Sequence, residues 1–396
     1  MLNVLHVIPG LSNSSGPTHI VNKLSSCLSD LGCNVSIFYL TGRELDTVMP
    51  KDERIYVKGF AVSRRLKYWG YSALLKKALL RHGDDFNVIH LHSLWMYPNI
   101  AVMKGAKKNN VPYIVAPQGS LDKWSLEHHS TRKKLYFNLM ERSVLNEAAG
   151  LHAVTEHEAN IFRNLGVKTP AYVIPNGVEL DDYQSMPDPQ IFKDNYQIGD
   201  EKTVLLYLSR LHPKKGLDLL IKAYAIACRS NPYLQLVIAG SDGGTGYSET
   251  VKQMLRKTGQ ENNVILTGEL KGKEKLEAFA AADIYTLTSY SEGLPIAVVE
   301  AMACGLPVVI TKGCYLPEVE EWRAGIIAET DVNSISKAII RLASSKKLRK
   351  ETGVKSKLLV NNKFGWKKIA ADVLDMYKTV ISEKPLELRS GHHEFR

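Results

Sequence analysis

Two pairs of charged residues in the second half of the sequence have the types and spacing of a site for a phosphate-linked sugar. Arg210 and Lys215 lie five positions apart in the stretch Ser-Arg-Leu-His-Pro-Lys-Lys-Gly, which follows an apolar run. Glu292 and Glu300 lie eight positions apart around the start of a predicted helix. Cations and free amides before a helix bind phosphate. Carboxylates do not, so the two glutamates would bind hydroxyl groups.

The elements that position these residues can be read from the stretch 289–310. The pattern predicts a helix over 296–304, with Pro295 where a first-turn proline is tolerated. Gly305 can take the left-handed conformation that ends a helix, and 306–310 is an apolar run typical of a buried parallel strand. The backbone N–H groups near Leu294 to Ile296 and the positive helix end would then face an anion. On composition alone, an ordinary strand–turn–helix with two solvated glutamates is an equal alternative.

The sequence EGLPIAVVE, followed by AMACGLPVV, resembles the E-x7-E signature of retaining glycosyltransferases of family 4, which have the GT-B fold. The stretch from Arg210 to Gly216 resembles the Arg-Leu-x-x-x-Lys-Gly motif of the same family. The resemblance implies an α/β protein with two Rossmann-like, doubly wound parallel-sheet domains that face each other across a cleft. We expect an acceptor-side domain over 1–177, a nucleotide-sugar-binding domain over 178–365, and a C-terminal helix at about 366–390 that packs back on the first domain.

The resemblance also implies roles for individual residues. Arg210 and Lys215 would stabilise the diphosphate leaving group, Glu292 would hold the sugar hydroxyls and favour oxocarbenium character, and Glu300 would bind the ribose. Retention would follow from same-face attack assisted by the leaving phosphate, without a protein nucleophile. The other expected donor-binding residues are Ser15, Gly16, Gln118, Gly268, Leu270, Gly293, Leu294, Pro295 and Ile296.

The first half of the sequence begins as a doubly wound sheet does. An apolar run at 2–8 leads through a loop to a predicted helix at 17–30 and a second strand at 34–40. Gly10 and Gly16 do not make the Gly-x-Gly-x-x-Gly fingerprint of dinucleotide binding. A nicotinamide-dependent dehydrogenase is therefore disfavoured.

The expected site residues of this half follow its strands. Ser15-Gly16 stands where the family usually has Gly-Gly, and Gln118 stands where many members have histidine. Glutamine forms hydrogen bonds but transfers no proton at neutral pH, so catalysis would not need a titratable group there. His92 and Trp95 follow the strand 88–91, where parallel strands meet a ligand crevice. We expect both to line the acceptor side.

Metals and cofactors are not expected. His90-x-His92 offers two nitrogens on one strand with no third ligand nearby, and no Asp-x-Asp pair is present. The five cysteines include no CxxC pair, so a zinc site or disulfide framework is disfavoured and a reducing cytoplasm fits. The N-terminus lacks the charged and long apolar regions of a signal peptide.

The charge of the chain is uneven. Residues 1–175 hold 21 Lys/Arg against 13 Asp/Glu, a net +8, out of +10 for the whole chain. No helix-turn-helix, finger or RNP pattern accompanies the basic clusters, so nucleic acid is disfavoured. The aromatic residues Tyr68, Trp69 and Tyr71 beside a basic cluster favour contact with an anionic membrane. A solvated basic face is an equal alternative.

We therefore expect a metal-independent transfer of a hexose from a nucleotide sugar to a saccharide or lipid-linked acceptor in polysaccharide biosynthesis, in the cytoplasm or at the inner face of its membrane. UDP-glucose is the first candidate donor, before GDP-mannose and UDP-N-acetylglucosamine. A nucleotide-sugar epimerase, a phosphorylase and a non-catalytic protein that binds nucleotides or membranes remain alternatives.

Overall fold

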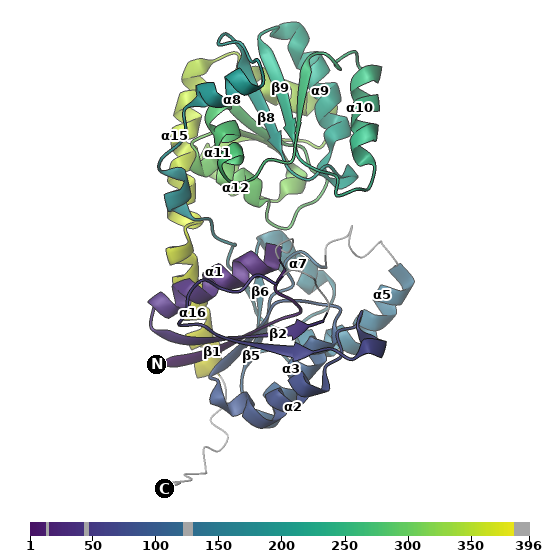
Figure 1. Ribbon diagram of the computed structural model, residues 1–396, viewed down its shortest axis with the longest axis vertical. Coiled ribbons are helices and arrows are strands. Elements are labelled where there is room, and N and C mark those ends of the chain that lie inside the picture. The colour runs from purple at the N-terminus through teal and green to yellow at the C-terminus, as the bar shows by residue number, and fades with distance from the viewer. Residues whose placement is uncertain (13–15, 43–46, 122–129, 384–396) are drawn as a thin grey trace. The chain divides into compact units, whose positions relative to one another are not determined.

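The computed structural model describes residues 1–12, 16–42, 47–121 and 130–383, without the side chains of residues 130–132 (Figure 1). The chain forms two compact units, one of residues 1–174 with 369–396 and one of residues 175–368. The sequence analysis placed these divisions after residues 177 and 365. The C-terminal helix expected at about 366–390 is α16 (Trp366–Ser382), which starts in the second unit, continues into the first and ends at Ser382.

The first unit contains a seven-stranded sheet in the order β3-β2-β1-β4-β5-β6-β7, parallel in every pair. Its strands are β1 (Leu2–Ile8), β2 (Cys33–Thr41), β3 (Tyr56–Ala61), β4 (Val88–Leu91), β5 (Tyr113–Val115), β6 (Gly150–Ala153) and β7 (Ala171–Val173). The chain first winds outward from β1 to β3 and then returns to place β4 on the other side of β1. The strand order therefore reverses between β1 and β4, which is where ligands bind in such sheets.

Helices cover both faces of this sheet, and Figure 1 shows α1 and α2 on opposite sides of it. The helices are α1 (Gly16–Asp30), α2 (Ala73–His82), α3 (Tyr97–Asn109), α5 (Ser130–Tyr136), α6 (Arg142–Asn146) and α7 (Glu156–Asn164). A π-helix, Phe137–Glu141, joins α5 to α6. The sequence does not reveal this π-helix, because no helical periodicity distinguishes it.

The second unit contains a six-stranded parallel sheet in the order β10-β9-β8-β11-β12-β13. Its strands are β8 (Thr203–Leu208), β9 (Leu234–Ala239), β10 (Val264–Gly268), β11 (Ile284–Leu287), β12 (Val308–Thr311) and β13 (Gly325–Ala328). Its helices are α8 (Pro189–Asn195), α9 (Leu217–Ser230), α10 (Tyr247–Lys257), α11 (Gly272–Ala281), α12 (Ile296–Ala303), α13 (Glu318–Glu321), α14 (Val332–Ala343) and α15 (Lys346–Lys363). Here the order reverses between β8 and β11.

The apolar runs of the sequence become the central strands. Every residue of β4, β11 and β12 is buried, because helices cover both faces of each sheet. The predicted α/β class, with two doubly wound parallel sheets, is confirmed. None of the described helices is long and apolar enough to cross a membrane.

Candidate donor and acceptor sites

The loops after β8 and β11 bring Lys215 and Glu292 together at the point where the second sheet reverses its order. Lys215 Nζ lies 2.7 Å from Oε1 and 2.9 Å from Oε2 of Glu292, and the hydroxyl of Ser289 also donates to Oε1. The Lys215 side chain is 14% exposed and that of Glu292 is 9% exposed. The two residues were expected in one site, but as partners of different parts of a ligand; their direct ion pair was not predicted.

Backbone contacts fix these two loops against each other. Gly216 has φ +67°, and a Cβ there would lie 1.9 Å from the carbonyl oxygen of Thr288. The Thr288 hydroxyl donates to the Gly216 carbonyl over 2.7 Å, and the Tyr290 N–H donates to the Lys214 carbonyl over 2.9 Å. Only glycine allows this close approach, so the motif that ends in Gly216 holds the preceding lysine next to Glu292.

The N-terminus of α12 follows directly. Pro295 is its N-cap residue, and the Pro295 carbonyl accepts from the Val298 N–H over 2.9 Å. Gly293 and Leu294 form the partly buried turn before it. Arg210 is exposed at the start of the other loop, where the Tyr207 hydroxyl donates to its carbonyl over 2.9 Å. This edge of the second unit therefore carries cationic side chains and the positive end of a helix.

Glu300 lies on α12 with two partners that the sequence analysis did not identify. Its Oε1 accepts from Lys275 Nζ over 2.9 Å and from the Tyr183 hydroxyl over 3.0 Å. Tyr183 belongs to a short 3-10 helix, Leu180–Tyr183. Because both bonds end on Oε1, the other oxygen can still accept from a hydroxyl group.

The expected base-binding residues lie at the end of β10. Gly268 has φ +78° and its carbonyl accepts from the Gly240 N–H over 2.7 Å. Gly268 is exposed, and Leu270 two residues later is partly buried. The backbone of this turn therefore lies at the same edge of the second sheet as the strand ends that carry Lys215 and Glu292.

In the first unit, a cavity of about 190 Å³ lies at the carboxyl ends of β1, β4 and β5. Its lining includes Gly10, His92 and Gln118, together with Ser93 and Ser120. This is the reversal point of the first sheet, and the structure brings His92 and Gln118 together there: Gln118 Nε2 lies 3.4 Å from His92 Nδ1. Gln118 has φ +50°, and its Oε1 is buried with no hydrogen-bond partner among the described residues.

The other expected residues of this half are Gly16, Ser15 and Trp95. Gly16 begins α1, and a Cβ there would meet no atom within 4 Å. Ser15 lies outside the described residues. Trp95 follows β4, and its indole N–H donates to the Ser120 carbonyl over 3.3 Å, beside the cavity lining. His92 borders the cavity although it is only 3% exposed.

Four buried histidines lie on one face of the first sheet: His6, His90, His92 and His152, which we call the histidine cluster. His6 Nδ1 and His92 Nε2 are 2.8 Å apart, and the Tyr377 hydroxyl lies 2.7 Å from His90 Nδ1. Burial lowers the pKa of His6 to about 3 and that of His152 to about 4, and it holds the pKa values of His90 and His92 well below 6.5. These rings are therefore neutral at pH 7.

We predicted from the sequence that His90 and His92 have no third ligand nearby, and this prediction is wrong. His6, on the adjacent strand, brings a third nitrogen, and the three lie close enough to hold one ion. His6 comes close to His90 because the register of β1 with β4 pairs these two residues. The amino-acid sequence alone does not reveal this register. The short His6–His92 contact shares a proton, so binding an ion at both nitrogens would have to break it.

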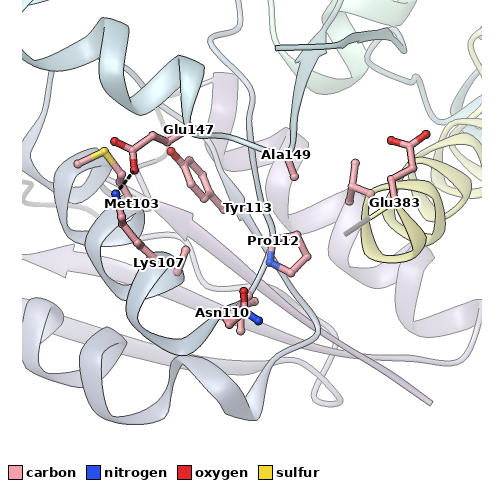
Figure 2. A pocket seen from close by; sticks show the side chains of 11 residues that line it. Met103, Lys107, Asn110, Pro112, Tyr113, Glu147, Ala149 and Glu383 are labelled. Atoms are coloured by element: carbon pink, nitrogen blue, oxygen red, sulfur yellow. Dashed lines mark hydrogen bonds and ion pairs between the residues drawn. The ribbon is translucent and has the colours of Figure 1, made fainter. Parts of the chain in front are cut away.

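A larger cavity of about 380 Å³ lies at the opposite end of the first sheet. Figure 2 shows its lining, with Lys107 and Glu147 joined by an ion pair of 3.1 Å. Pro112 and Ala149 in its wall precede β5 and β6, so the cavity lies at the amino ends of the strands. Ligands of doubly wound sheets bind at the carboxyl ends. Its size alone does not make it the functional site.

Comparison with known proteins finds two family matches, one in each half of the chain. Residues 15–177 match a family of glycosyl transferase 4-like domains, and residues 188–358 match glycosyl transferases group 1. A D-inositol 3-phosphate glycosyltransferase of Kineococcus radiotolerans is 23% identical over 413 aligned positions, which cover 96% of this chain and 94% of that protein. A GDP-mannose-dependent phosphatidylinositol monomannoside mannosyltransferase of Mycolicibacterium smegmatis is 28% identical over 246 positions, which cover 59% of this chain and 63% of that protein.

Solved structures show the same fold. Sucrose-phosphate synthase of Thermosynechococcus elongatus superposes with a TM-score of 0.78 at 17% identity, over 96% of this chain and 100% of that one. An Anabaena protein solved in complex with UDP-glucose superposes with a TM-score of 0.74 at 18% identity, with the same coverage. With both halves of the sequence matched to glycosyltransferase domains and both sheets matched in space, this chain belongs to the glycosyltransferases of family 4 and has the GT-B fold.

Proposed function

We propose that this glycosyltransferase moves a hexose from a nucleoside diphosphate sugar to a saccharide or lipid-linked acceptor, with retention of configuration and without a metal. The observation that carries the proposal is the Lys215–Glu292 pair, held beside the N-terminus of α12 where the second sheet reverses its order. A cation, a carboxylate and a helix end in one place suit a ligand that is anionic at one end and rich in hydroxyls at the other.

Cleavage of the bond between the sugar and the diphosphate builds negative charge on the leaving group and positive charge on the sugar. Lys215, Arg210 and the amides near Leu294 to Ile296 would stabilise the diphosphate. Glu292 would accept from sugar hydroxyls and favour the developing oxocarbenium ion. These cations replace a metal in the proposal, which predicts full activity in EDTA.

Glu300 would hold the ribose of the donor. Its Oε1 is occupied by Lys275 and Tyr183, which also fix the carboxylate in place. The second oxygen would accept from ribose hydroxyls, and the turn at Gly268 and Leu270 would meet the base. In the first unit, Gly16, Gln118 and Ser15 are proposed as donor-binding residues.

UDP-glucose is the first candidate donor. The Anabaena structural neighbour was solved with this molecule, whereas two of the sequence relatives are named as GDP-mannose-dependent enzymes. The two donors differ in base and in sugar, so a panel of both and of UDP-N-acetylglucosamine separates them. A polysaccharide precursor is proposed as the acceptor.

We also propose that the first unit contacts an anionic membrane through a basic apolar patch. The patch joins the 3-10 helix Arg64–Leu66 and its following residues to α5 and the π-helix, where the Trp69 indole donates to the Tyr136 hydroxyl over 2.8 Å. Its exposed members are Arg64, Arg65, Leu66, Lys67, Tyr68, Lys134, Leu135 and Leu139. Tyr68 is 94% exposed and Leu139 is 65% exposed. Exposed apolar side chains among cations suit a lipid surface that carries negative charge.

A nucleotide-sugar panel in EDTA tests the donor proposal. Thermal stabilisation by one UDP- or GDP-sugar, together with slow release of its nucleotide, is expected. NMR of the product should show the anomeric configuration of the donor. Conversion of the nucleotide sugar into an isomer would indicate an epimerase, and dependence on free phosphate a phosphorylase. Stabilisation without turnover, unchanged in Glu292→Gln, would indicate a binding protein.

Sedimentation with vesicles tests the membrane proposal. The protein should sediment with phosphatidylethanolamine vesicles that contain phosphatidylglycerol and much less with vesicles that lack it. Leu139→Glu should reduce this binding several-fold, because it places a carboxylate in the patch. Lys347→Glu, at an exposed position of the second unit, is the matched control. Equal binding by both variants would contradict the assignment of the patch.

A further inference from the structure

Trp95 has a backbone conformation that its own side chain disfavours. It follows β4 with φ +71°, in the left-handed region that costs a non-glycine residue about 1–2 kcal/mol. Such conformations persist only where the surroundings hold them, and they are concentrated at functional sites. This conformation could not be predicted, because nothing in the residue types around Trp95 requires a positive φ.

The side chain that holds this conformation is Glu141. Its Oε1 accepts from the backbone N–H of Trp95 over 2.7 Å, and both of its oxygens accept from Asn99 Nδ2 over 3.1 Å. Glu141 is 1% exposed and ends the π-helix, a form of helix that is frequent at functional sites. The buried carboxylate of Glu141 is therefore held by two neutral donors, the Trp95 N–H and the Asn99 amide, both on residues that follow β4.

Both arms of this network end at the cavity of the first unit. One arm runs through Asn99, whose Oδ1 accepts from the Ser93 hydroxyl over 3.0 Å. The other runs through Trp95, whose indole N–H donates to the Ser120 carbonyl. Ser93 and Ser120 both line the cavity. Glu141 itself does not, so any effect it has on a ligand there acts through its partners.

The indole of Trp95 is a partly exposed aromatic surface at this edge. The rings of Tyr136 and Phe137 lie with their centroids 6.3 Å from it, and Lys133 Nζ lies 5.8 Å from its centroid. An aromatic face beside hydroxyl and carbonyl groups suits a pyranose, which offers an apolar C–H face and polar edges.

We propose that Glu141 is a positioning residue for the acceptor: its carboxylate fixes Trp95 and the Asn99–Ser93 pair, and the acceptor's sugar ring stacks on the Trp95 indole at the edge of the cavity. The inference rests on the proposed glycosyl transfer and names a residue that the family motifs do not include. Glu141 stabilises the platform and does not touch the acceptor.

The network gives this role a pH dependence. Burial raises the pKa of Glu141 to about 7, against the hydrogen bonds from Asn99 and Trp95, which lower it. Proton uptake by Glu141 replaces an acceptor oxygen by a donor that faces two other donors, the Trp95 N–H and Asn99 Nδ2. Trp95 and Asn99 are therefore held less firmly as the pH falls through this value. The neighbouring hydroxyls of Tyr113 and Tyr136 have pKa values raised by burial, so neither titrates in this range. Lys133 Nζ faces the Trp95 indole.

The test compares Glu141→Gln with wild type. Glutamine keeps the shape and one acceptor for the Trp95 N–H, whereas truncation to alanine would leave buried donors unpaired and could unfold the unit. Glu277→Gln, at a buried carboxylate of the second unit, is the control for loss of a buried charge. Two rates are measured with UDP-glucose across pH 6 to 8: hydrolysis, and transfer to methyl and octyl α-D-glucopyranoside. Tryptophan fluorescence is followed over the same range.

We expect Glu141→Gln to keep donor hydrolysis within about twofold and to raise the KM for the glucoside about tenfold or more. The wild-type fluorescence should change near pH 7, and this change should be absent in Glu141→Gln and in Trp95→Phe. Equal loss of hydrolysis and transfer, a fluorescence transition that persists in Glu141→Gln, or glucosides that change neither turnover nor fluorescence would overturn the inference. Absence of hydrolysis of every donor in the nucleotide-sugar panel by the wild type would instead contradict the proposed function.

Discussion

Replacement of Lys215 by methionine separates the role of the Lys215–Glu292 pair in folding from its role in transfer. Methionine keeps most of the side-chain volume but removes the charge, so Glu292, 9% exposed, retains the Ser289 hydroxyl as its one side-chain partner among the described residues. Removing one partner of a buried ion pair costs about 3–5 kcal/mol because the other charge is left uncompensated. Loss of a cation that stabilises the leaving group should lower turnover by about 10²–10³-fold, or about 2.7–4 kcal/mol.

The double variant Lys215→Met with Glu292→Gln distinguishes the two effects. It contains no uncompensated charge, so most of the lost stability should return, whereas turnover should stay as low as in the single variant. Unfolding in urea measures the first quantity and single-turnover release of UDP the second. Lys312→Met removes an exposed ion pair with Glu329, and it should change stability by about 1 kcal/mol or less and leave turnover unchanged.

Two results would refute this reasoning. Wild-type turnover in a folded Lys215→Met protein would show that the lysine does not stabilise the leaving group. Recovery of turnover in the double variant would show that the single variant failed only because it was destabilised.

Three further predictions concern other contacts of the two units. Burial lowers the pKa values of the histidine cluster below those of the unfolded chain, so the unfolded state takes up more protons and the free energy of unfolding should fall as the pH drops below about 6.5, offset in part by proton uptake at Glu141. Urea unfolding at pH 7 and pH 5 measures this, and equal midpoints would contradict it. Gly216→Ala should lower the free energy of unfolding by about 3 kcal/mol or more, since its Cβ would overlap the Thr288 carbonyl. Gly259→Ala, with a similar φ and open space, should lower it by about 1–2 kcal/mol. Similar losses of stability in the two variants, measured by thermal unfolding, would refute the clash. Tyr183→Phe removes one bond to Glu300 and should weaken UDP binding by about three- to tenfold in calorimetry, with hydrolysis at saturating donor unchanged; unaltered affinity would remove Glu300 from the ribose site.

The sequence predicted the α/β fold with two parallel sheets because the signals for its strands are local. The strands of the second sheet are short apolar runs, and Gly216 and Gly305 take the positive φ values that their places after a loop and a helix require. Lys215 and Glu292 were placed in one site, since both follow strands of one parallel sheet. Their direct contact was not predicted, because it depends on which strands are neighbours.

The features that the sequence did not reveal depend on pairing between distant segments. The third nitrogen of the histidine cluster comes from the register of β1 with β4. Glu141 reaches Trp95 from a π-helix 46 residues later in the chain. Tyr183 supports Glu300 from a short 3-10 helix 117 residues earlier in the chain. In each case the residue type was visible, and the partner was set by tertiary packing.

The most direct test of the central claim is UDP release from UDP-glucose and GDP release from GDP-mannose in EDTA, by wild type and by Glu292→Gln. We expect that one donor is cleaved by the wild type without metal and that Glu292→Gln binds the same donor but cleaves it at least about a hundredfold more slowly. Equal cleavage by the two proteins, or cleavage only after a divalent metal is added, would contradict it.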